Sequence, residues 1–120
     1  MGVVHAFEVL AEPVRRRLVE LLALGEQPAG ALTDVVRAEF GISQPAVSQH
    51  LKVLRDAGFA TVRAEGPRRI YTTDRAGLDA AAAALARLRA PLRQRLDALH
   101  TEVARGRRAS ASTHRRKDAS

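Results

Sequence analysis

The sequence contains no cysteine, no tryptophan and few aromatic residues of any kind. Without cysteine the chain cannot form disulfides, thiolate metal sites or redox-sensing thiols. Aromatic residues at 3% are too few to stack a series of unpaired bases, which argues against proteins that bind RNA or single strands. No apolar run approaches the roughly 20 residues that cross a bilayer, and the N-terminus lacks the basic-then-apolar pattern of a signal peptide. These absences predict a cytoplasmic protein with no membrane partner.

Residue sets that support catalysis are missing as well. No glycine-rich phosphate loop, no paired carboxylates and no combination of serine, histidine and acid can be assigned to one pocket. We therefore expect neither enzymatic activity nor a cofactor.

Basic residues outnumber acidic ones. The 120-residue chain, short enough for one domain, contains 20 Lys and Arg against 13 Asp and Glu, a net charge of +7. Such a charge favours an anionic partner such as nucleic acid. Residues 105–120 hold six of the basic residues and one acid, which leaves fourteen basic and twelve acidic residues in 1–104. The part of the chain that we expect to fold is therefore only mildly basic.

Apolar spacing and turn residues predict a largely helical domain with one hairpin. Helices are expected around Phe7 and Leu10, then over 13–24, 29–40 and 43–57. Ser43 is suited to cap the last of these, and Gly58 to end it. Short β-prone runs over 60–65 and 69–73 flank Gly66-Pro67 and predict a two-stranded hairpin with a basic tip.

A long helix is expected from Asp74 to about residue 105, because apolar residues recur there at every third or fourth position. Its stripe comprises Leu78, Ala82, Leu85, Leu88, Leu92, Leu96, Leu99 and Val103. Pro91 lies inside the stripe, so we expect a kink or two abutting helices there. Residues 106–120 lack an apolar period and are predicted to form a disordered basic tail. The expected division is thus a domain over 1–105 and a tail over 106–120.

The order of the middle elements is that of a winged helix-turn-helix, because a turn of about three residues separates 29–40 from 43–57 and the hairpin follows. We therefore predict a mainly α fold with a small β-hairpin wing. In the second helix, an apolar edge is expected to pack against the rest of the domain. It consists of Val47, Leu51 and Leu54. Polar side chains on the other edge can reach bases in the major groove. These exposed residues are Gln44, Ser48, Gln49 and Lys52.

A resemblance to the ArsR family of bacterial winged-helix repressors lies in the segment GISQPAVSQHLKVLRDAGFATVRAEGPRRIY, which is similar to that family's recognition helix and wing. The segment AFEVLAEPVRRRLVELL resembles the family's opening, so the resemblance covers residues 5 to about 73. It implies a homodimer that binds operator DNA near its own genes and represses transcription. The residues that it places against DNA are Ser43, Gln44, Ser48, Gln49, His50 and Lys52 in the recognition helix, and Arg68 and Arg69 in the wing.

The chain departs from that family in two respects. The segment from Leu32 to Ser43 is a few residues longer than usual. Metal-sensing members use cysteines, or His and acid pairs on the last helix, and this chain has no cysteine. The candidate ligands left on that helix are Asp79, Asp97, His100 and Glu102. A metal site needs three or four ligands held in place, so we expect no metal.

The apolar stripe of the last helix is longer than a domain of this size can cover by itself. A second copy of the chain is its natural cover, together with apolar residues of the first helix. The chain is therefore predicted to be a homodimer. The expected dimerisation residues are Phe7, Leu10, Leu85, Leu88, Leu92, Leu96 and Leu99.

The arginines that open the second helix, Arg15–Arg17, allow two interpretations. They either touch backbone phosphates or pair with Glu12 and Glu20 on neighbouring turns. For Arg15 and Arg16 the sequence favours neither, so both stay candidate phosphate contacts.

His50 and the basic tail are equally open. His50 lies between the buried edge and the exposed edge of the recognition helix. There it either packs against the domain or donates a hydrogen bond to a phosphate. The tail is either a solvated end or, as we favour, a nonspecific DNA-binding arm. Its basic residues are Arg107, Arg108, Arg115, Arg116 and Lys117.

The function predicted from these features is sequence-specific binding of double-stranded DNA by a transcriptional regulator. We expect a homodimeric repressor of its own or a neighbouring operon, acting at an inverted repeat. One alternative is an architectural DNA-binding protein, which lacks the preference of about 10³-fold or more that a repressor shows for its operator. Another is a protein-interaction module whose stripe binds a different partner.

Overall fold

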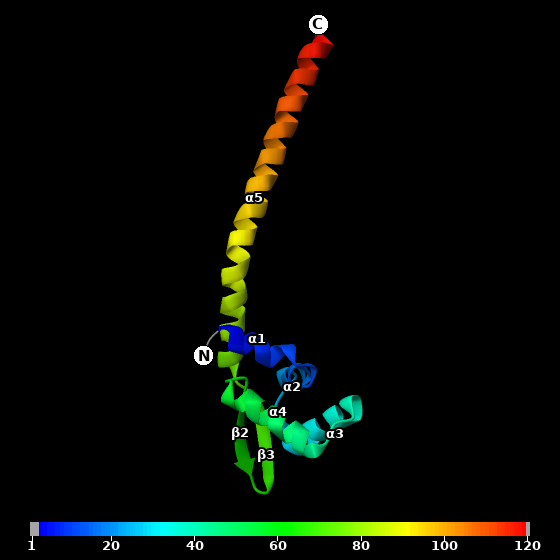
Figure 1. Ribbon diagram of the computed structural model, residues 1–120, viewed down its shortest axis with the longest axis vertical. Helices are drawn as coiled ribbons and strands as arrows, with labels where there is room; N and C mark the ends of the chain where they lie inside the picture. Colours follow the sequence, from blue (N-terminus) through cyan, green and yellow to red (C-terminus); the bar gives the residue numbers. More distant parts are fainter. Residues whose placement is uncertain (1–2, 120) are drawn as a thin grey trace. The chain divides into compact units, whose positions relative to one another are not determined.

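The computed structural model describes the backbone of residues 3–119 and the side chains of residues 5–106. The chain forms two compact units, Met1–Ala84 and Leu85–Ser120, whereas the sequence pattern predicted a boundary after residue 105. No described side chain beyond Ala84 is buried, and the division into a domain over 1–105 and a tail over 106–120 stays a prediction. Figure 1 traces the elements along the chain.

The first two helices meet at Glu12. Helix α1 spans Val3–Ala11 and helix α2 spans Pro13–Ala23. The Glu12 carboxylate caps α2 by accepting a hydrogen bond from the Arg15 N–H at 2.8 Å. Proline suits the first turn of α2 because its missing N–H would have no partner there.

The predicted helix-turn-helix is confirmed. Helix α3 spans Ala29–Phe40 and helix α4 spans Gln44–Asp56. Gly41 ends α3 with a φ of 67°, a left-handed conformation that glycine adopts without a steric penalty. The Ser43 hydroxyl then caps α4 by accepting the N–H of Ala46 at 3.3 Å. The end of α3 at Gly41 and the cap of α4 at Ser43 together set the length of the turn.

The C-terminal end of α4 also follows the prediction. Gly58 adopts a φ of 80°, and the N–H of Phe59 donates back to the carbonyl of Leu54 at 2.8 Å. This reversal brings the Phe59 ring into the core, where it is 1% exposed.

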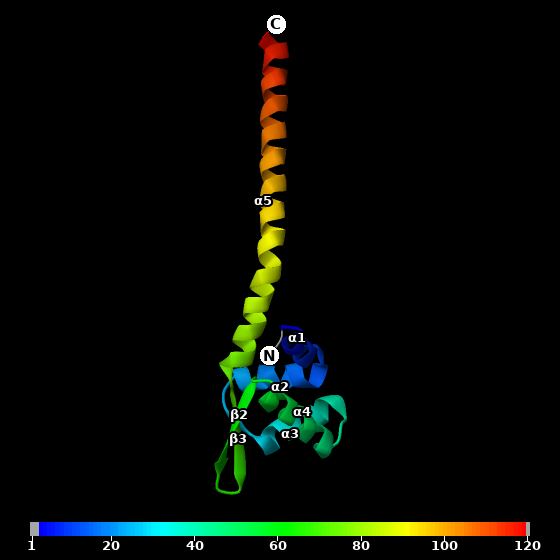
Figure 2. The ribbon, with the colours of Figure 1, turned by 60° about the vertical axis from the view of Figure 1, so that its left-hand side comes forward.

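The wing belongs to a three-stranded antiparallel sheet of order β1-β3-β2. Strands β2, Ala60–Glu65, and β3, Arg68–Thr73, form the predicted hairpin, which is visible beside α3 and α4 in Figure 2. The third strand, β1 (Gln27–Pro28), pairs with Ile70 and Tyr71 of β3. The sequence pattern predicted only two strands, because a two-residue strand has no apolar alternation.

The core of the unit Met1–Ala84 lies among α2, α3, α4 and the sheet. Its innermost side chains are completely shielded from solvent: Leu18, Leu32, Val36, Val47 and Leu54. Each such burial contributes about 1.5–3 kcal/mol relative to an exposed side chain. The core therefore holds the two helices of the helix-turn-helix against α2 and fixes which side of α4 faces solvent.

The last helix, α5, spans Arg75–Ala119. The Asp74 carboxylate accepts the N–H of Ala76 at 2.9 Å and so caps its first turn. Ala81 and Ala84 are buried, whereas Ala82, which the apolar pattern placed on the stripe, is exposed. Small side chains on the buried face allow α5 to lie close to the core.

The helix is continuous through Pro91, so the expected split into two abutting helices does not occur. It also continues to Ala119, although the sequence pattern predicted disorder from residue 106. Extension of an existing helix orders only one residue per added hydrogen bond, and alanine and arginine, which are frequent there, favour helix. Among the described residues, no helix is both long and apolar enough to cross a membrane.

Candidate nucleic-acid interface

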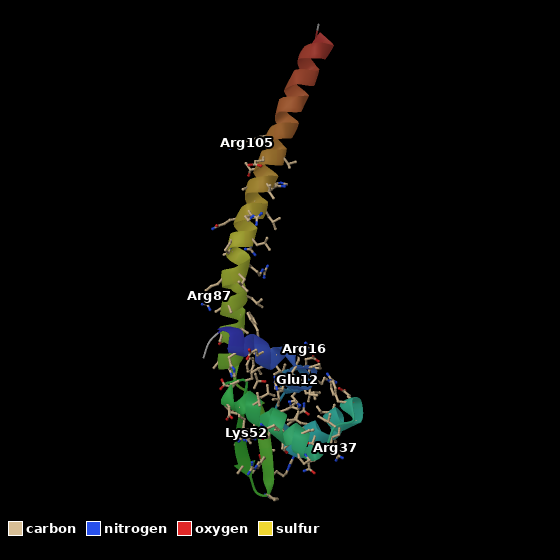
Figure 3. All side chains as sticks on the ribbon, viewed as in Figure 1. Glu12, Arg16, Arg37, Lys52, Arg87 and Arg105 are labelled. Carbon is tan, nitrogen blue, oxygen red and sulfur yellow. The ribbon has the colours of Figure 1, made fainter. Side chains whose placement is uncertain are left out.

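One side of α4 is polar and open to solvent. Its exposed residues are Ser43, Gln44, Ser48, Gln49 and Lys52. The opposite side, formed by Val47, Leu51 and Leu54, is at most 3% exposed. Because the buried edge anchors the helix, its polar edge is held outward as a firm surface. In Figure 3, Lys52 and Arg37 lie on the side of this unit that is turned away from α1.

The wing supplies exposed positive charge next to this polar edge. Arg68 and Arg69 are both exposed on β3. Arg69 lines a groove of about 530 Å³ between α3, α4 and β3, which Gln44, Ser48 and Lys52 also line. Arg68 lies instead at a second hollow, between the first turn of α3 and the tip of the wing. The structure thus brings most of the predicted DNA-facing residues to one groove.

His50 differs from the other predicted contacts, because its side chain is only 22% exposed. Its Nδ1 atom lies 3.7 Å from Oε2 of Glu12 and has no hydrogen-bond partner within the described part of the chain. The imidazole therefore packs α4 against the junction of α1 and α2. This placement supports the packing interpretation of His50 over the phosphate-donor one.

Arg15 and Arg16 direct their side chains to backbone carbonyls rather than to the glutamates on neighbouring turns. Arg15 donates from Nε to the carbonyl of Val9 at 3.0 Å and from a terminal nitrogen to the carbonyl of Glu8 at 3.2 Å. Arg16 donates to the carbonyl of Leu10 at 3.5 Å. Both guanidinium groups thus cap the C-terminal end of α1, whose last carbonyls lack helical partners. Neither arginine forms an ion pair with Glu12 or Glu20 among the described side chains, and their contact with backbone phosphates stays a prediction.

The third arginine of that run forms an ion pair that the sequence did not reveal. Arg17 donates to both carboxylate oxygens of Glu39 on α3, with shortest distances of 2.9 and 3.0 Å. It also forms the ion pair with Glu20 that the sequence offered as one alternative, at 3.3 Å. The hydrogen bonds to Glu39 raise the pKa of Arg17 and lower that of Glu39. The pair ties α2 to the last turn of α3, just before the helix-turn-helix turn.

A second pair braces the wing. Arg63 on β2 donates to both carboxylate oxygens of Glu26, at 2.6 and 2.9 Å, and to Glu65 at 3.2 Å. These bonds lower the pKa of Glu26 and connect β2 to the residue before β1. No short motif marks such a pair, because 37 residues separate its members.

Loss of the Glu39 carboxylate is expected to change the acid dependence of stability. The lowered pKa of Glu39 means that the folded state gains stability from it above the ordinary value of 4.5, and loses that gain as the pH falls through the lowered pKa. In Glu39→Gln, the free energy of unfolding should fall less steeply below pH 4.5 than in the wild type. Urea unfolding between pH 3 and 6 measures this.

Glu102→Gln is the matched control for that measurement, since no ion pair joins Glu102 to another described side chain. An acid dependence as steep in Glu39→Gln as in the wild type would show that the ion pair is not maintained in solution. The expected difference is small, because ion pairs on the surface contribute little to stability.

The unit Leu85–Ser120 carries an uncovered apolar stripe. Its leucines and one valine are between 50 and 64% exposed: Leu85, Leu88, Leu92, Leu96, Leu99 and Val103. The other predicted dimerisation residues, Phe7 and Leu10, are half-buried against the core of the first unit. Large aliphatic side chains repeated along one helix face form a surface that favours association.

Within the described residues, no three His, Asp or Glu side chains gather closely enough to hold a metal ion. The candidate ligands Asp97, His100 and Glu102 are all exposed on α5. The basic residues predicted for the tail, from Arg107 to Lys117, lie outside the part of the chain whose side chains are described.

Helix α4 is anchored by its buried edge and exposes a polar edge; a second helix precedes it and a basic hairpin follows it. This arrangement defines a winged helix-turn-helix DNA-binding protein. The family model for a "Helix-turn-helix domain" matches residues 10–63, which include α2, α3, α4 and most of β2.

Two curated relatives are similar over this region. The "HTH-type transcriptional regulator Rv2034" of Mycobacterium tuberculosis is 43% identical over 76 residues, 63% of this chain and 67% of the relative. The "Probable mercury resistance operon repressor" of Streptomyces lividans is 35% identical over 66 residues, 55% of this chain. The match spans only half of that repressor's length.

Solved structures extend the similarity to the fold. The crystal structure of a "Possible transcriptional regulator for arsenical resistance" is 43% identical with a TM-score of 0.63, covering 78% of this chain and 93% of that protein. An "ArsR family transcriptional regulator" is 25% identical with a TM-score of 0.62, covering 71% of this chain and 84% of that one. The chain belongs to the ArsR family of winged helix-turn-helix transcriptional regulators, as its sequence predicted, and is a DNA-binding regulator of transcription.

Proposed function

We propose that this protein is a homodimeric repressor that binds an inverted-repeat operator in its own or a neighbouring operon and has no catalytic activity. The observation that carries the proposal is the outward polar edge of α4 next to the exposed wing arginines. The repressor name of the Streptomyces lividans relative supports the direction of regulation. Binding of the purified protein to fragments of its own promoter, with a footprint on the retained fragment, tests the proposal.

Two groups of residues on this surface have different roles in DNA binding. Gln44, Ser48 and Gln49 read base edges, because their short polar side chains can donate and accept hydrogen bonds in the major groove. Lys52, Arg68 and Arg69 bind phosphates, which gives affinity without sequence preference. Ser43 serves mainly as the cap of α4, since its hydroxyl already accepts the Ala46 N–H.

Substitution of one residue from each role should give different results. Gln44→Ala is expected to relax preference at one base pair of each half-site, a change of about 1–3 kcal/mol in discrimination. Arg69→Ala is expected to weaken operator and random DNA alike and to reduce the salt dependence of binding by about one phosphate contact. Binding curves on an operator and its single-base variants, at several salt concentrations, measure both effects.

Footprints and base preferences that match those of the wild type in both variants would contradict this assignment of roles. An architectural protein would instead show little difference between operator and random DNA already in the wild type. The wild-type measurement therefore decides between the two functions before any variant is made.

Dimerisation is part of the proposal because one recognition helix reads only a few base pairs. Two recognition helices related by a two-fold axis and spaced about 34 Å apart would meet successive major grooves on one face of the DNA. The exposed stripe of the unit Leu85–Ser120 is the surface we propose for the contact, covered by the same stripe of a second copy.

A further inference from the structure

The groove between α3, α4 and β3 is lined by more charged side chains than those predicted to contact DNA. Its floor includes Leu51 and Tyr71, which are nearly inaccessible to solvent. Around this apolar floor stand four basic side chains and one acidic side chain: Arg37, Lys52, Arg55, Arg69 and Asp34. Two of these arginines, Arg37 and Arg55, and the single acid were not recognised as site residues from the sequence.

The two unassigned arginines are in different situations. Arg37 already has a partner, because its Nε donates to the carbonyl of Ile42 at 3.3 Å and so steadies the turn before α4. Arg55 has none in the described part of the chain, and its Nε is shielded from solvent. An N–H group that is removed from water without a partner destabilises the folded state. Arg55 nevertheless lines the groove, where its guanidinium can donate to a ligand with anionic oxygen atoms.

The position of Arg55 indicates which ligand this is. Arg55 lies three residues after Lys52 on α4, so the two side chains share one side of the helix. Both line the groove together with Arg69 of the wing. Guanidinium groups bind phosphate oxygens with paired, directional hydrogen bonds. The wall of the same groove carries Gln44 and Ser48, so a phosphate bound there would adjoin the residues proposed to read bases.

Asp34 opposes this arrangement. It is exposed on α3, lines the groove and forms no ion pair with another described side chain. Its carboxylate therefore repels any polyanion that enters.

We propose that Arg55, with Lys52 and Arg69, binds a backbone phosphate of the operator in this groove, and that Asp34 limits the affinity of the groove for DNA of any sequence. The inference rests on the proposed function, since it adds a phosphate-binding residue and an opposing charge to the same interface. Because the two residues act in opposite directions on affinity, their substitutions should shift the affinity for DNA in opposite directions.

The test measures the affinity of the full-length protein for its operator and for random duplex DNA between 50 and 200 mM salt. Arg55→Gln should weaken binding to both DNAs about tenfold, as expected for loss of a hydrogen bond to a charged group. It should also reduce the slope of log affinity against log salt by about 0.9, the value for one phosphate contact. Asp34→Asn should strengthen binding to both DNAs about fivefold, because a nearby repulsive charge is removed.

Arg75→Gln is the matched control, since Arg75 is exposed in the first turn of α5 and does not line the groove. It removes the same charge and should leave the salt slope unchanged. Thermal unfolding of each variant accompanies the binding curves, because a loss of affinity through misfolding would lower the melting temperature and would affect both slope and preference.

Three outcomes would overturn the inference: an unchanged slope in Arg55→Gln, weaker binding in Asp34→Asn, or effects that appear with single-stranded DNA and not with duplex. Each of these is distinct from failure of the proposed function, which would show as a wild-type protein without preference for the operator. If the wild type discriminates and the variants behave as stated, both conclusions hold.

Discussion

Aspartates in place of both Leu92 and Leu96 are expected to abolish the proposed dimer and to weaken operator binding by about 10²–10⁴-fold, the range by which two linked sites exceed one. The two leucines are 55 and 58% exposed in the single chain. Covering each would contribute up to about 1.5–3 kcal/mol, whereas a carboxylate in the same contact would be desolvated without a partner. Sedimentation velocity at micromolar protein and operator titration measure the two effects.

The matched control is Ala90→Asp combined with Gln94→Asp. It introduces two acidic side chains at the same four-residue spacing but on a different side of α5, and both positions are exposed. It should leave the dimer intact. A wild-type protein that sediments as a stable monomer would refute the proposed dimer, and circular dichroism would show whether the leucine variant has merely lost its helix.

Valine in place of Gly77 is expected to destabilise the protein by about 3 kcal/mol, the upper part of the range for overpacking a close contact. A Cβ atom at this position would lie 2.7 Å from the carbonyl oxygen of Gly58 and 2.8 Å from the ring of Phe59. The N–H of Gly77 also donates to that carbonyl at 2.7 Å. A side chain would therefore force α5 away from the end of α4 and break the hydrogen bond.

Gly106→Val is the control, because a Cβ atom there would meet nothing within 4 Å. Valine and glycine are both weak helix formers, with valine somewhat the better, so stability should be unchanged or slightly higher. Urea unfolding of the two variants gives the comparison. Equal stability for Gly77→Val and the wild type would mean that α5 does not approach the core as closely as described.

Local features of the sequence determined the elements that make up the helix-turn-helix. Ser43, Gly41 and Gly58 act on hydrogen bonds within four or five residues along the chain, so their effect can be read from neighbouring positions alone. The same holds for the polar edge of α4, because the 3.6-residue period separates Gln44 and Ser48 from the buried edge. Fold class and most of the candidate site followed from these signals.

The sequence was less informative wherever a contact joins distant residues. Strand β1 pairs with β3 across more than 40 residues, and Arg17 bonds Glu39 across 22. In neither case does the sequence around one partner indicate which residue the other partner is. The sequence likewise did not indicate that the side-chain acceptors of Arg15 are the carbonyls of α1.

Only the tertiary structure decided which polar groups meet at the groove. Arg55 belongs to the last turn of α4, Asp34 to α3 and Arg69 to β3, and no periodicity relates the three. They line one groove because the buried faces of α3 and α4 pack against each other and the sheet, which fixes the remaining faces at a definite separation. Short-range hydrogen bonds and apolar spacing determine where a helix lies in the chain and which of its faces is buried. Which faces of three different elements come together depends on how their buried sides pack in the core.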